Sequence, residues 1–528
     1  MDLRILIESP ASSTSPPPSP YFDAAAPSLT LAGRVWRLSR SLDVANQSTW
    51  PPFTCVSFTW GPHRVANPLQ PGHLMSAKTI PALAAAIRHH FHSQPQDDTH
   101  RAAFWVDSLC IPATQPDRHA TLHSMGFIYS RAAAVVVTLS GPLGALLDRM
   151  ASDRKCVLTE DELRIAEGDE WITSVWTYQE VANSQDLVFV AIDEGADHES
   201  AAAGASSGRG VSVSDFLSCI GYSLTRHTRG TALTPFDVRT AFPRMDALED
   251  LAVDILTSST RSALQAMSNI DRRICAPARP ENRIYAMIGV ITQSPYTPTA
   301  TPHTSGLDPT IPELAESFMR ECDRKGDFSY LYSSAERDDV MGRRWRPKAG
   351  DIPAVLLWCV YGSGQAGHYD ARGFWLDGVH CIDALAGGAA TVGEAGRQKV
   401  LQWLGSPDSR MGDAEIAEAL AHRLRQVGFT GSDSPVTTPH GIFFPQTTVR
   451  PDARAQDEYV IIIPATLEWV FGRPALARIR TCAVDGAESV VSFVPGVFAG
   501  SAPDTMASSV LLDPGAQQAT PDAGNDGY

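Results

Sequence analysis

Three short apolar runs near the start of the chain most limit what it can fold into. Each ends in small or polar side chains, and segments with helical spacing separate the runs. Buried strands of a parallel sheet are continuously apolar, and strands that alternate with helices favour a parallel sheet with helices on both faces. We therefore predict an α/β fold. The predicted elements are strands at 54–59, 103–107, 134–139 and 187–192 and helices at 79–92, 117–131 and 171–183.

The ends of these strands are the expected ligand edge of the sheet. Ligands of open parallel sheets bind beyond the C-terminal ends of the strands. This rule selects Ser57 to Gly61, Asp107 to Cys110, and Ser140-Gly141. We expect Ser57, Asp107 and Ser140 to lie along one edge of the sheet.

Composition narrows the class of protein. Hydrophobic residues make up 43% and charged residues 19% of the chain, as in an ordinary globular protein. The net charge of −16 argues against a nucleic-acid binder, and nine cysteines without CxxC pairs fit reduced thiols. The N-terminus lacks a signal-peptide pattern, and Pro464 and Glu468 break the apolar stretch at 459–472. We expect a soluble, cytoplasmic protein that spans no membrane and binds no nucleic acid.

Changes in composition along the chain suggest its domain organisation. Stretches rich in Ser, Pro, Ala or Gly predict disorder, and a Thr/Pro-rich stretch predicts a linker. The expected divisions are a disordered leader at 1–30, an N-terminal domain at 31–290 with its core at 50–195 and a helical extension at 213–290, a linker at 291–310, a smaller β-leaning α+β region at 311–502, and a disordered tail at 503–528.

Ordered sequence blocks between Cys55 and Glu180 carry a family resemblance. They are Ser57-Phe-Thr-Trp60-Gly61, Trp105-Val-Asp107-Ser-Leu-Cys110-Ile111, Met125-Gly-Phe-Ile-Tyr129, Val135-Val-Val-Thr-Leu-Ser-Gly141 and Trp176-Thr-Tyr-Gln179-Glu180. In this order they resemble the heterokaryon incompatibility (HET) domain of fungal proteins. The later Arg283-Ile-Tyr-Ala-Met-Ile-Gly289 is similar to a block that closes many members of that family.

Three positions depart from the family pattern. Pro62 stands where the family often has an acidic residue, and Pro112-Ala113 replaces the usual Asn-Gln. Glu281-Asn282 replaces an expected Arg-Asp. These changes remove polar groups close to the predicted ligand edge, so a divergent or weakened site is an open alternative.

The resemblance implies a role in fungal allorecognition and programmed cell-death signalling. The HET family is similar in outline to TIR domains, so the implied fold is a TIR/flavodoxin-like parallel sheet. Some TIR domains hydrolyse NAD with a glutamate four residues after a tryptophan, and Trp176 and Glu180 have that spacing. The implied site has Glu180 as catalytic residue, NAD as a substrate and no cofactor. Self-association through the HET domain, together with an unknown protein partner, is the implied mode of action.

Glu180 suits this chemistry if its helix starts near Ser174, because the carboxylate then lies in the second turn. If the helix starts at Trp171, Glu180 moves away from the ligand edge. One carboxylate can stabilise an oxocarbenium-like ribose and orient its hydroxyls. Alternatively, Glu180 caps a loop or pairs with an arginine, Asp107 caps a turn, and the tryptophans are core. The candidate substrate-binding residues are Ser57, Trp60, Gly61, Asp107, Cys110 and Trp176.

Two other functions remain open. One is a non-catalytic signalling scaffold of the same family. The other is a hydrolase in which Cys110 is the nucleophile and His119 or His123 the base, although buried cysteines are mostly inert. The two histidines lack an evident third ligand, so we predict no metal site.

Overall fold

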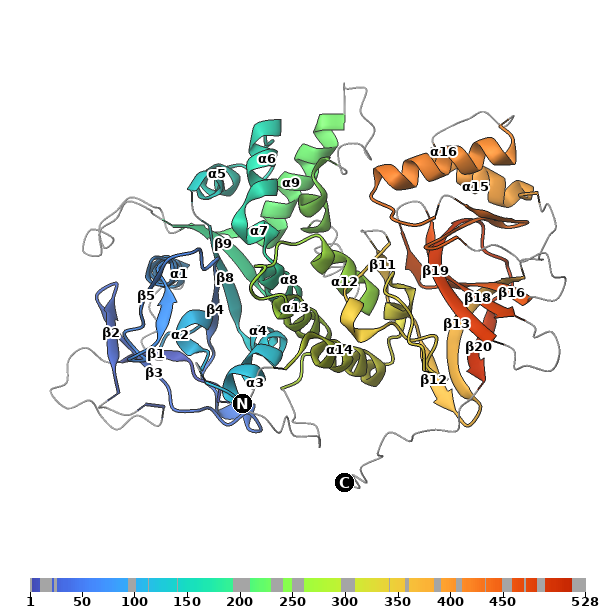
Figure 1. Cartoon of the computed structure of the whole chain (residues 1–528). Coiled ribbons are helices and arrows are strands. Elements are labelled where there is room, and N and C mark those ends of the chain that lie inside the picture. The colour runs from blue at the N-terminus through green and yellow to red at the C-terminus, as the bar shows by residue number, and fades with distance from the viewer. Residues whose placement is uncertain are drawn as a thin grey trace. The chain divides into compact units, whose positions relative to one another are not determined.

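The computed structural model of the chain forms two compact units (Figure 1). The first comprises Met1–Thr257 and Arg272–Thr310, and the second comprises Ser258–Asp271 and Ile311–Tyr528. The structure describes residues 2–9, 21–22, 26–93, 101–112, 114–139, 141–192, 209–228, 241–248, 261–295, 309–340, 342–356, 360–383, 391–404, 411–432, 434–448, 458–469, 472–481 and 490–514.

The first unit is built on a mixed sheet with the strand order β10-β9-β8-β4-β7-β1-β3-β2. Its central strands β7, β4, β8 and β9 are parallel, and the strands at both sides of this core pair antiparallel. The predicted α/β fold with a parallel core is therefore confirmed. The strands are β1 (Leu6–Ser9), β2 (Ser28–Leu31), β3 (Arg34–Leu38), β4 (Thr54–Ser57), β7 (Ala103–Val106), β8 (Ala134–Leu139), β9 (Leu187–Ala191) and β10 (Val211–Ser212), and β5 (Arg64–Ala66) and β6 (Leu74–Ser76) form a separate hairpin.

The prediction of a disordered leader at 1–30 is wrong for the residues that form β1 and β2. Strand β1 lies between β7 and β3 in the sheet. Leu3, Ile5, Leu6 and Ile7 are at most 1% exposed, so this segment buries enough apolar surface to offset the entropy lost on ordering. Residues 10–20 and 23–25, which hold most of the Ser/Pro-rich part, lie outside the described residues.

Helices pack on this sheet and on one another. Helix α1 packs against β4, β8 and β9, and its Leu83 and Ile87 are buried. The predicted helix at 117–131 is interrupted at Ser124, and the one at 171–183 is interrupted at Ser174. The helices are α1 (Thr79–Ser93), α2 (Asp107–Cys110), α3 (Asp117–His123), α4 (Met125–Arg131), α5 (Gly141–Ser152), α6 (Glu160–Gly168), α7 (Glu170–Thr173), α8 (Val175–Asn183), α9 (Val213–Thr228) and α13 (Glu281–Ile291).

Helices α4, α8 and α13 meet at two glycines. A Cβ atom on Gly126 would come within 1.8 Å of the Gly289 carbonyl oxygen, and one on Gly289 within 1.6 Å of Gln179 Oε1. Asn183 Nδ2 donates to the Gly289 carbonyl at 2.8 Å. The block from Arg283 to Gly289 thus packs against α8, the helix that carries Glu180.

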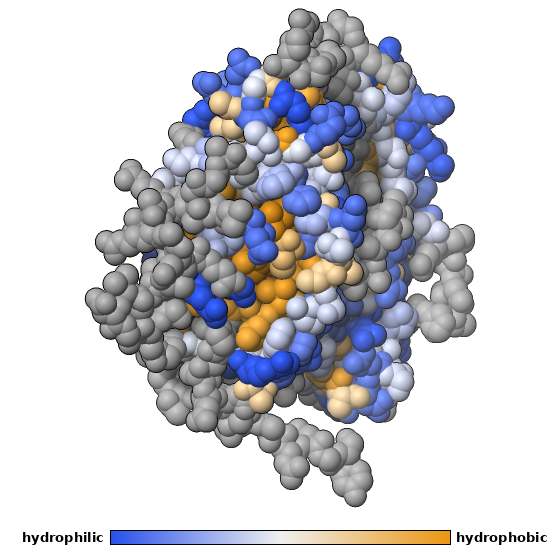
Figure 2. All heavy atoms as spheres, turned by 90° about the vertical axis from the view of Figure 1, so that its right-hand side faces the viewer, coloured by the Kyte–Doolittle hydropathy of each residue, from blue (hydrophilic) through white to orange (hydrophobic). Residues whose placement is uncertain are grey.

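The second unit is an antiparallel sheet with helices. Its strand order is β12-β13-β16-β18-β19-β15-β14, and β20 pairs with β13. This confirms the predicted β-leaning C-terminal region. Figure 2 shows apolar residues gathered between hydrophilic ones on the face turned to the viewer. The larger elements are β12 (Gly367–Asp370), β13 (Gly373–Asp383), β14 (Val436–Thr438), β15 (Gly441–Pro445), β16 (Glu458–Pro464), β18 (Arg473–Thr481), β19 (Val490–Gly500), β20 (Ala507–Pro514), α12 (Ala263–Asp271), α14 (Ile311–Lys325), α15 (Glu394–Leu404) and α16 (Asp413–Gln426).

The prediction of a disordered tail at 503–528 is wrong for β20. This strand pairs with β13 from Ala507 to Pro514, and its Leu512 is fully buried. Residues 515–528 lie outside the described residues. Among the helices that the structure describes, none is long and apolar enough to cross a membrane.

Candidate functional site

The parallel strands bring Ser57 and Asp107 to the same edge of the sheet. Strand β4 pairs in parallel with β7 and with β8, so all three strands end on one side, as predicted. Ser57 is the last residue of β4, and Asp107 directly follows β7. Ser140, which was expected to lie beside them, is outside the described residues.

Helix α8 delivers Glu180 to Ser57. The helix begins after Ser174, whose Oγ accepts the Trp176 N–H at 3.3 Å, so Ser174 is the N-cap. Of the two starting points considered, this one puts Glu180 in the second turn. Cys55 and Ser57 are two positions apart in β4, so their side chains point to the same face of the sheet. The Ser57 hydroxyl donates a hydrogen bond to Glu180 Oε2.

A tryptophan completes this chain of hydrogen bonds. Trp171 Nε1 donates to Ser57 Oγ at 2.7 Å. The indole N–H therefore leaves the serine hydroxyl free to donate its own hydrogen to Glu180, because an indole can only donate. The result is a directed chain from Trp171 through Ser57 to the carboxyl group of Glu180.

Burial controls the protonation of Glu180. Its side chain is 4% exposed, and loss of hydration raises its pKa to about 8. The charge of Asp107 adds to this rise, whereas the hydroxyls of Ser57 and Tyr129 and the cation of Arg273 oppose it. Glu180 therefore holds a proton at neutral pH and can release it within the physiological range.

Asp107 is the second acid of the site, and it is half-buried. Its Oδ1 accepts the Ser108 N–H at 2.5 Å, and its Oδ2 accepts Trp60 Nε1 at 2.6 Å. Burial raises the pKa of Asp107 to about 7. These two bonds hold the Asp107 carboxyl against the loop that follows β4 and fix the indole of Trp60 at the ligand edge.

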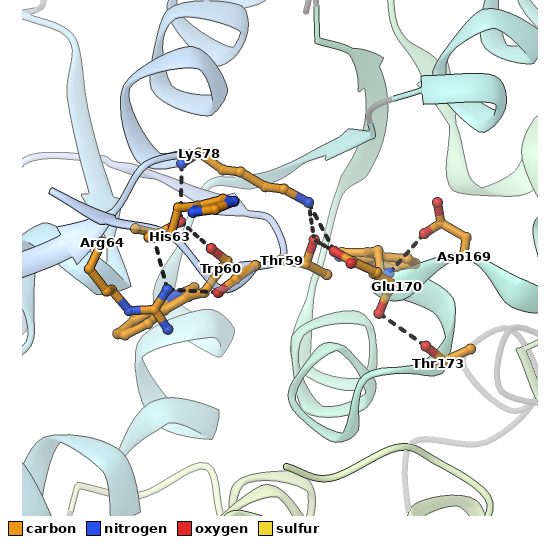
Figure 3. A network of polar contacts seen from close by, with 11 residues as sticks. Thr59, Trp60, His63, Arg64, Lys78, Asp169, Glu170 and Thr173 are labelled. Atoms are coloured by element: carbon orange, nitrogen blue, oxygen red, sulfur yellow. Dashed lines mark hydrogen bonds and ion pairs between the residues drawn. The ribbon is translucent and has the colours of Figure 1, made fainter.

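Charged residues surround Trp60 and Gly61 at the surface. The Arg64 guanidinium lies 5.4 Å from the centre of the Trp60 ring, close enough for a cation–π contact. Gly61 has a φ of 58°, a left-handed conformation in which a side chain would be strained, and its missing Cβ leaves room for Lys78. Figure 3 shows Lys78 extending from this side toward Glu170, with Thr59 between them.

The remaining candidates lie apart from this chain of bonds. Trp176 is half-buried in the first turn of α8, and Trp171, which we did not select from the sequence, is the tryptophan that reaches Ser57. Cys110 is 2% exposed, accepts the Val106 N–H, and has its pKa raised to about 12 by burial, so its thiol stays protonated. His119 Nδ1 bonds the Tyr285 hydroxyl at 2.7 Å. These surroundings do not favour a Cys110 nucleophile.

Other residues that support the site could not be identified from the sequence, because their hydrogen-bond partners are far away in the chain. Arg273 is buried and donates to the carbonyls of Ile172 and Ser174 and to Thr177 Oγ1, which secures the corner between α7 and α8. Trp171 precedes the block Trp176-Thr-Tyr-Gln179-Glu180 by five residues, and this closeness was the available signal. Within the described ranges, no group of three or more His, Cys, Asp or Glu side chains could hold a metal ion.

These features define the class of the first unit: a mixed α/β domain with one buried and one half-buried carboxyl group at the C-terminal edge of its parallel strands. Residues 53–180 match the model of the family described as heterokaryon incompatibility protein (HET). The chain thus carries a HET domain over these residues, which confirms the resemblance and implies a role in heterokaryon incompatibility. Searches of curated proteins and of solved structures found no match.

Proposed function

We propose that this HET domain cleaves the N-glycosidic bond of NAD, with Glu180 as the catalytic carboxylate, and that this activity serves allorecognition and programmed cell death. The observation that carries the proposal is the state of Glu180. It is a buried acid with a pKa raised to about 8, held by a directed chain of hydrogen bonds at the ligand edge. Strongly perturbed acids in such places are typical of functional sites.

Cleavage of the N-glycosidic bond of NAD requires little more from the protein than one correctly positioned carboxylate. Nicotinamide leaves NAD as a neutral molecule, so its departure needs no general acid. The ribose that remains carries positive charge, which an ionised Glu180 stabilises by electrostatics and by hydrogen bonds to the sugar hydroxyls. The positive pyridinium ring of NAD favours the ionised form of a nearby carboxyl, and so lowers the pKa of Glu180 as the substrate binds.

Spacing supports the same proposal. Glu180 follows Trp176 by four residues, which is the spacing in the TIR domains that hydrolyse NAD. The position in the fold differs, because α5, α6 and α7 lie between the third parallel strand, β8, and α8. The strand–helix alternation of the first unit is also similar to theirs. Trp60 is positioned to stack on a nicotinamide or adenine ring, because its indole is fixed beside Asp107.

The test compares two buried glutamates in the full chain. We expect Glu180→Gln to lower the release of nicotinamide from NAD about 10²–10³-fold, because the charge is lost and the shape is kept. Glu180→Asp should fall between this variant and the parent protein. Glu167 on α6 is the matched control, because burial also raises its pKa and its carboxyl group accepts from the backbone amides of Arg244 and Met245.

Glu167→Gln should leave turnover unchanged. Unchanged turnover in Glu180→Gln, with circular dichroism showing an intact fold in both variants, would disprove the catalytic role. Each protein has to be assayed both dilute and concentrated, since self-association through the HET domain is part of the proposal.

A second candidate function is a signalling scaffold without catalysis. The near-complete burial of Glu180 favours it, because no substrate can reach the carboxyl without a movement of the residues above it. Cell-death signalling that persists in Glu180→Gln, in a protein that self-associates but releases no nicotinamide, would support the scaffold.

A further inference from the structure

A small surface cluster lies next to the two chain segments that hold Ser57 and Trp171. It consists of Thr59, Lys78 and Glu170 (Figure 3). Thr59 is two residues beyond Ser57, and Glu170 directly precedes Trp171, so the cluster joins the two chain segments whose next side chains form the buried hydrogen-bonded chain.

The cluster already has the form of an occupied anion site. Lys78 Nζ donates to Glu170 Oε2 at 2.9 Å, and Thr59 Oγ1 donates to the same oxygen at 3.1 Å. Lys78 Nζ also lies 3.5 Å from Thr59 Oγ1, so the two donors converge on one point. An ammonium group and a hydroxyl aimed at one anionic oxygen are suited to a carboxylate or to a phosphate.

Glu170, which occupies this anion site, forms only a weak ion pair with Lys78. The Glu170 side chain is 64% exposed and that of Lys78 36% exposed. Exposed ion pairs contribute little to stability, because water solvates both partners well when they separate. Glu170 can therefore rotate into solvent without burying a charge, whereas Lys78 stays beside Gly61 at the ligand edge.

We propose that Lys78 and Thr59 bind a phosphate of the ligand and that Glu170 is an internal competitor, which occupies this anion site until the ligand displaces it. The choice of a phosphate-bearing nucleotide rests on the proposed function, since the pyrophosphate of NAD supplies such a group. Displacement of Glu170 leaves the Lys78 ammonium group and the Thr59 hydroxyl to hold the phosphate, two residues along the chain from Ser57.

The test measures binding without turnover. The probe is ADP-ribose, titrated by calorimetry at low salt into the full chain carrying Glu180→Gln. Adding Glu170→Ala should tighten binding about two- to five-fold, the range that corresponds to an exposed ion pair. Adding Lys78→Ala should weaken binding, and adding Glu170→Ala to the Lys78 variant should then have no further effect.

The control separates local competition from overall charge. Glu160 forms an exposed ion pair with Arg164 on α6, so Glu160→Ala changes the net charge by the same amount. It should leave the affinity unchanged. Inorganic pyrophosphate is the second probe. If Lys78 binds the phosphate, the affinities of the variants for pyrophosphate should rank in the same order as their affinities for ADP-ribose.

Three results would overturn the inference: no binding of ADP-ribose to any variant, equal effects of Glu170→Ala and Glu160→Ala, or tightening by Glu170→Ala that persists without Lys78. Because hydrolysis is not measured, binding as expected together with a failed turnover test would reject only the catalytic role of Glu180.

Discussion

Glu180 and Asp107 are both carboxyl groups with little access to water, and they form hydrogen bonds with different partners. A carboxylate without water is costly unless it is paired, and keeping a proton is the usual way to avoid that cost. Glu180 accepts from a serine hydroxyl, and Asp107 accepts from an indole and a backbone amide. Both therefore have pKa values near neutrality, so a small change in their surroundings can change their charge.

The raised pKa of Glu180 makes stability depend on pH. Its ordinary pKa is 4.5 and its pKa in the folded protein is about 8. Between these values the folded protein keeps a proton that the unfolded chain has lost. The free energy of unfolding therefore falls as pH rises through this window, by up to about 1.4 kcal/mol per pH unit, and levels off above it.

We expect Glu180→Gln to remove this dependence, because glutamine does not titrate. The melting temperature of the variant, relative to the parent protein, should rise between pH 5 and pH 8. Glu162→Gln is the control, since Arg149 lowers the pKa of Glu162 to about 2 and nothing titrates there above pH 5. A difference in melting temperature between Glu180→Gln and the parent protein that stays constant from pH 5 to pH 8 would contradict the raised pKa of Glu180.

At this scale the sequence predicted the acids but not their partners. Ser57, Asp107 and Glu180 could be placed together because strand ends converge and because the N-cap at Ser174 sets the phase of α8. Trp171 and Ser57 are 114 positions apart, and nothing local shows which of several tryptophans will reach that serine. Hydrogen bonds across such separations depend on tertiary packing, which a pattern of apolar residues leaves open.

Among the elements, the helices were predicted more closely than their interruptions. Apolar spacing located the segments at 117–131 and 171–183, but both contain a break at a serine. Ser174 has an extended conformation with ψ of 140°, which ends α7 and lets its side chain cap α8. A serine inside a helical pattern is compatible with either outcome, so spacing alone could not separate them.

The contact of α4 with α13 gives a prediction at this scale. Gly126→Ala places a methyl group within 1.8 Å of a backbone carbonyl that cannot rotate away, so the helices must separate. We expect a loss of about 1–3 kcal/mol or more in the free energy of unfolding of the first unit.

Gly168→Ala is the matched control for this change. Gly168 ends α6, and nothing lies within 4 Å of the Cβ that alanine would add. Urea unfolding should show this variant to be neutral or slightly stabilised, since alanine favours a helix more than glycine does. Equal midpoints for the two variants would show that α4 and α13 are not closely packed.

Across the whole molecule, the parallel core of the first unit and the β-leaning second region were predictable, whereas the terminal strands β1 and β20 were not. Strands β1 and β20 come from terminal regions whose average composition predicts disorder, yet each contains a short apolar run. Averaging over a long window hides a strand of this length. The predicted linker at 291–310 ends where the chain enters the second unit for the last time. The chain also changes unit at 257–258 and at 271–272, and no change in composition accompanies these two boundaries.

Truncation from the C-terminus tests the position of β20. Removing residues 515–528 should leave the melting temperature unchanged. Removing 507–528 should lower it by several degrees, because Leu512 is fully buried, Ser509 bonds Asp377 and the edge of β13 loses its partner. Equal melting temperatures for the two proteins would mean that β20 contributes nothing to the second unit.

The interleaving of the two units constrains how the protein is made. Helix α12 belongs to the second unit but leaves the ribosome before α13, which completes the first. In that unit α12 contacts the turn Ser329–Tyr332, which is synthesised about 60 residues later. At typical rates of synthesis that is roughly 3–12 s, a period in which the nascent chain offers the apolar side chains of α12, Leu264, Met267 and Ile270 among them, to chaperones.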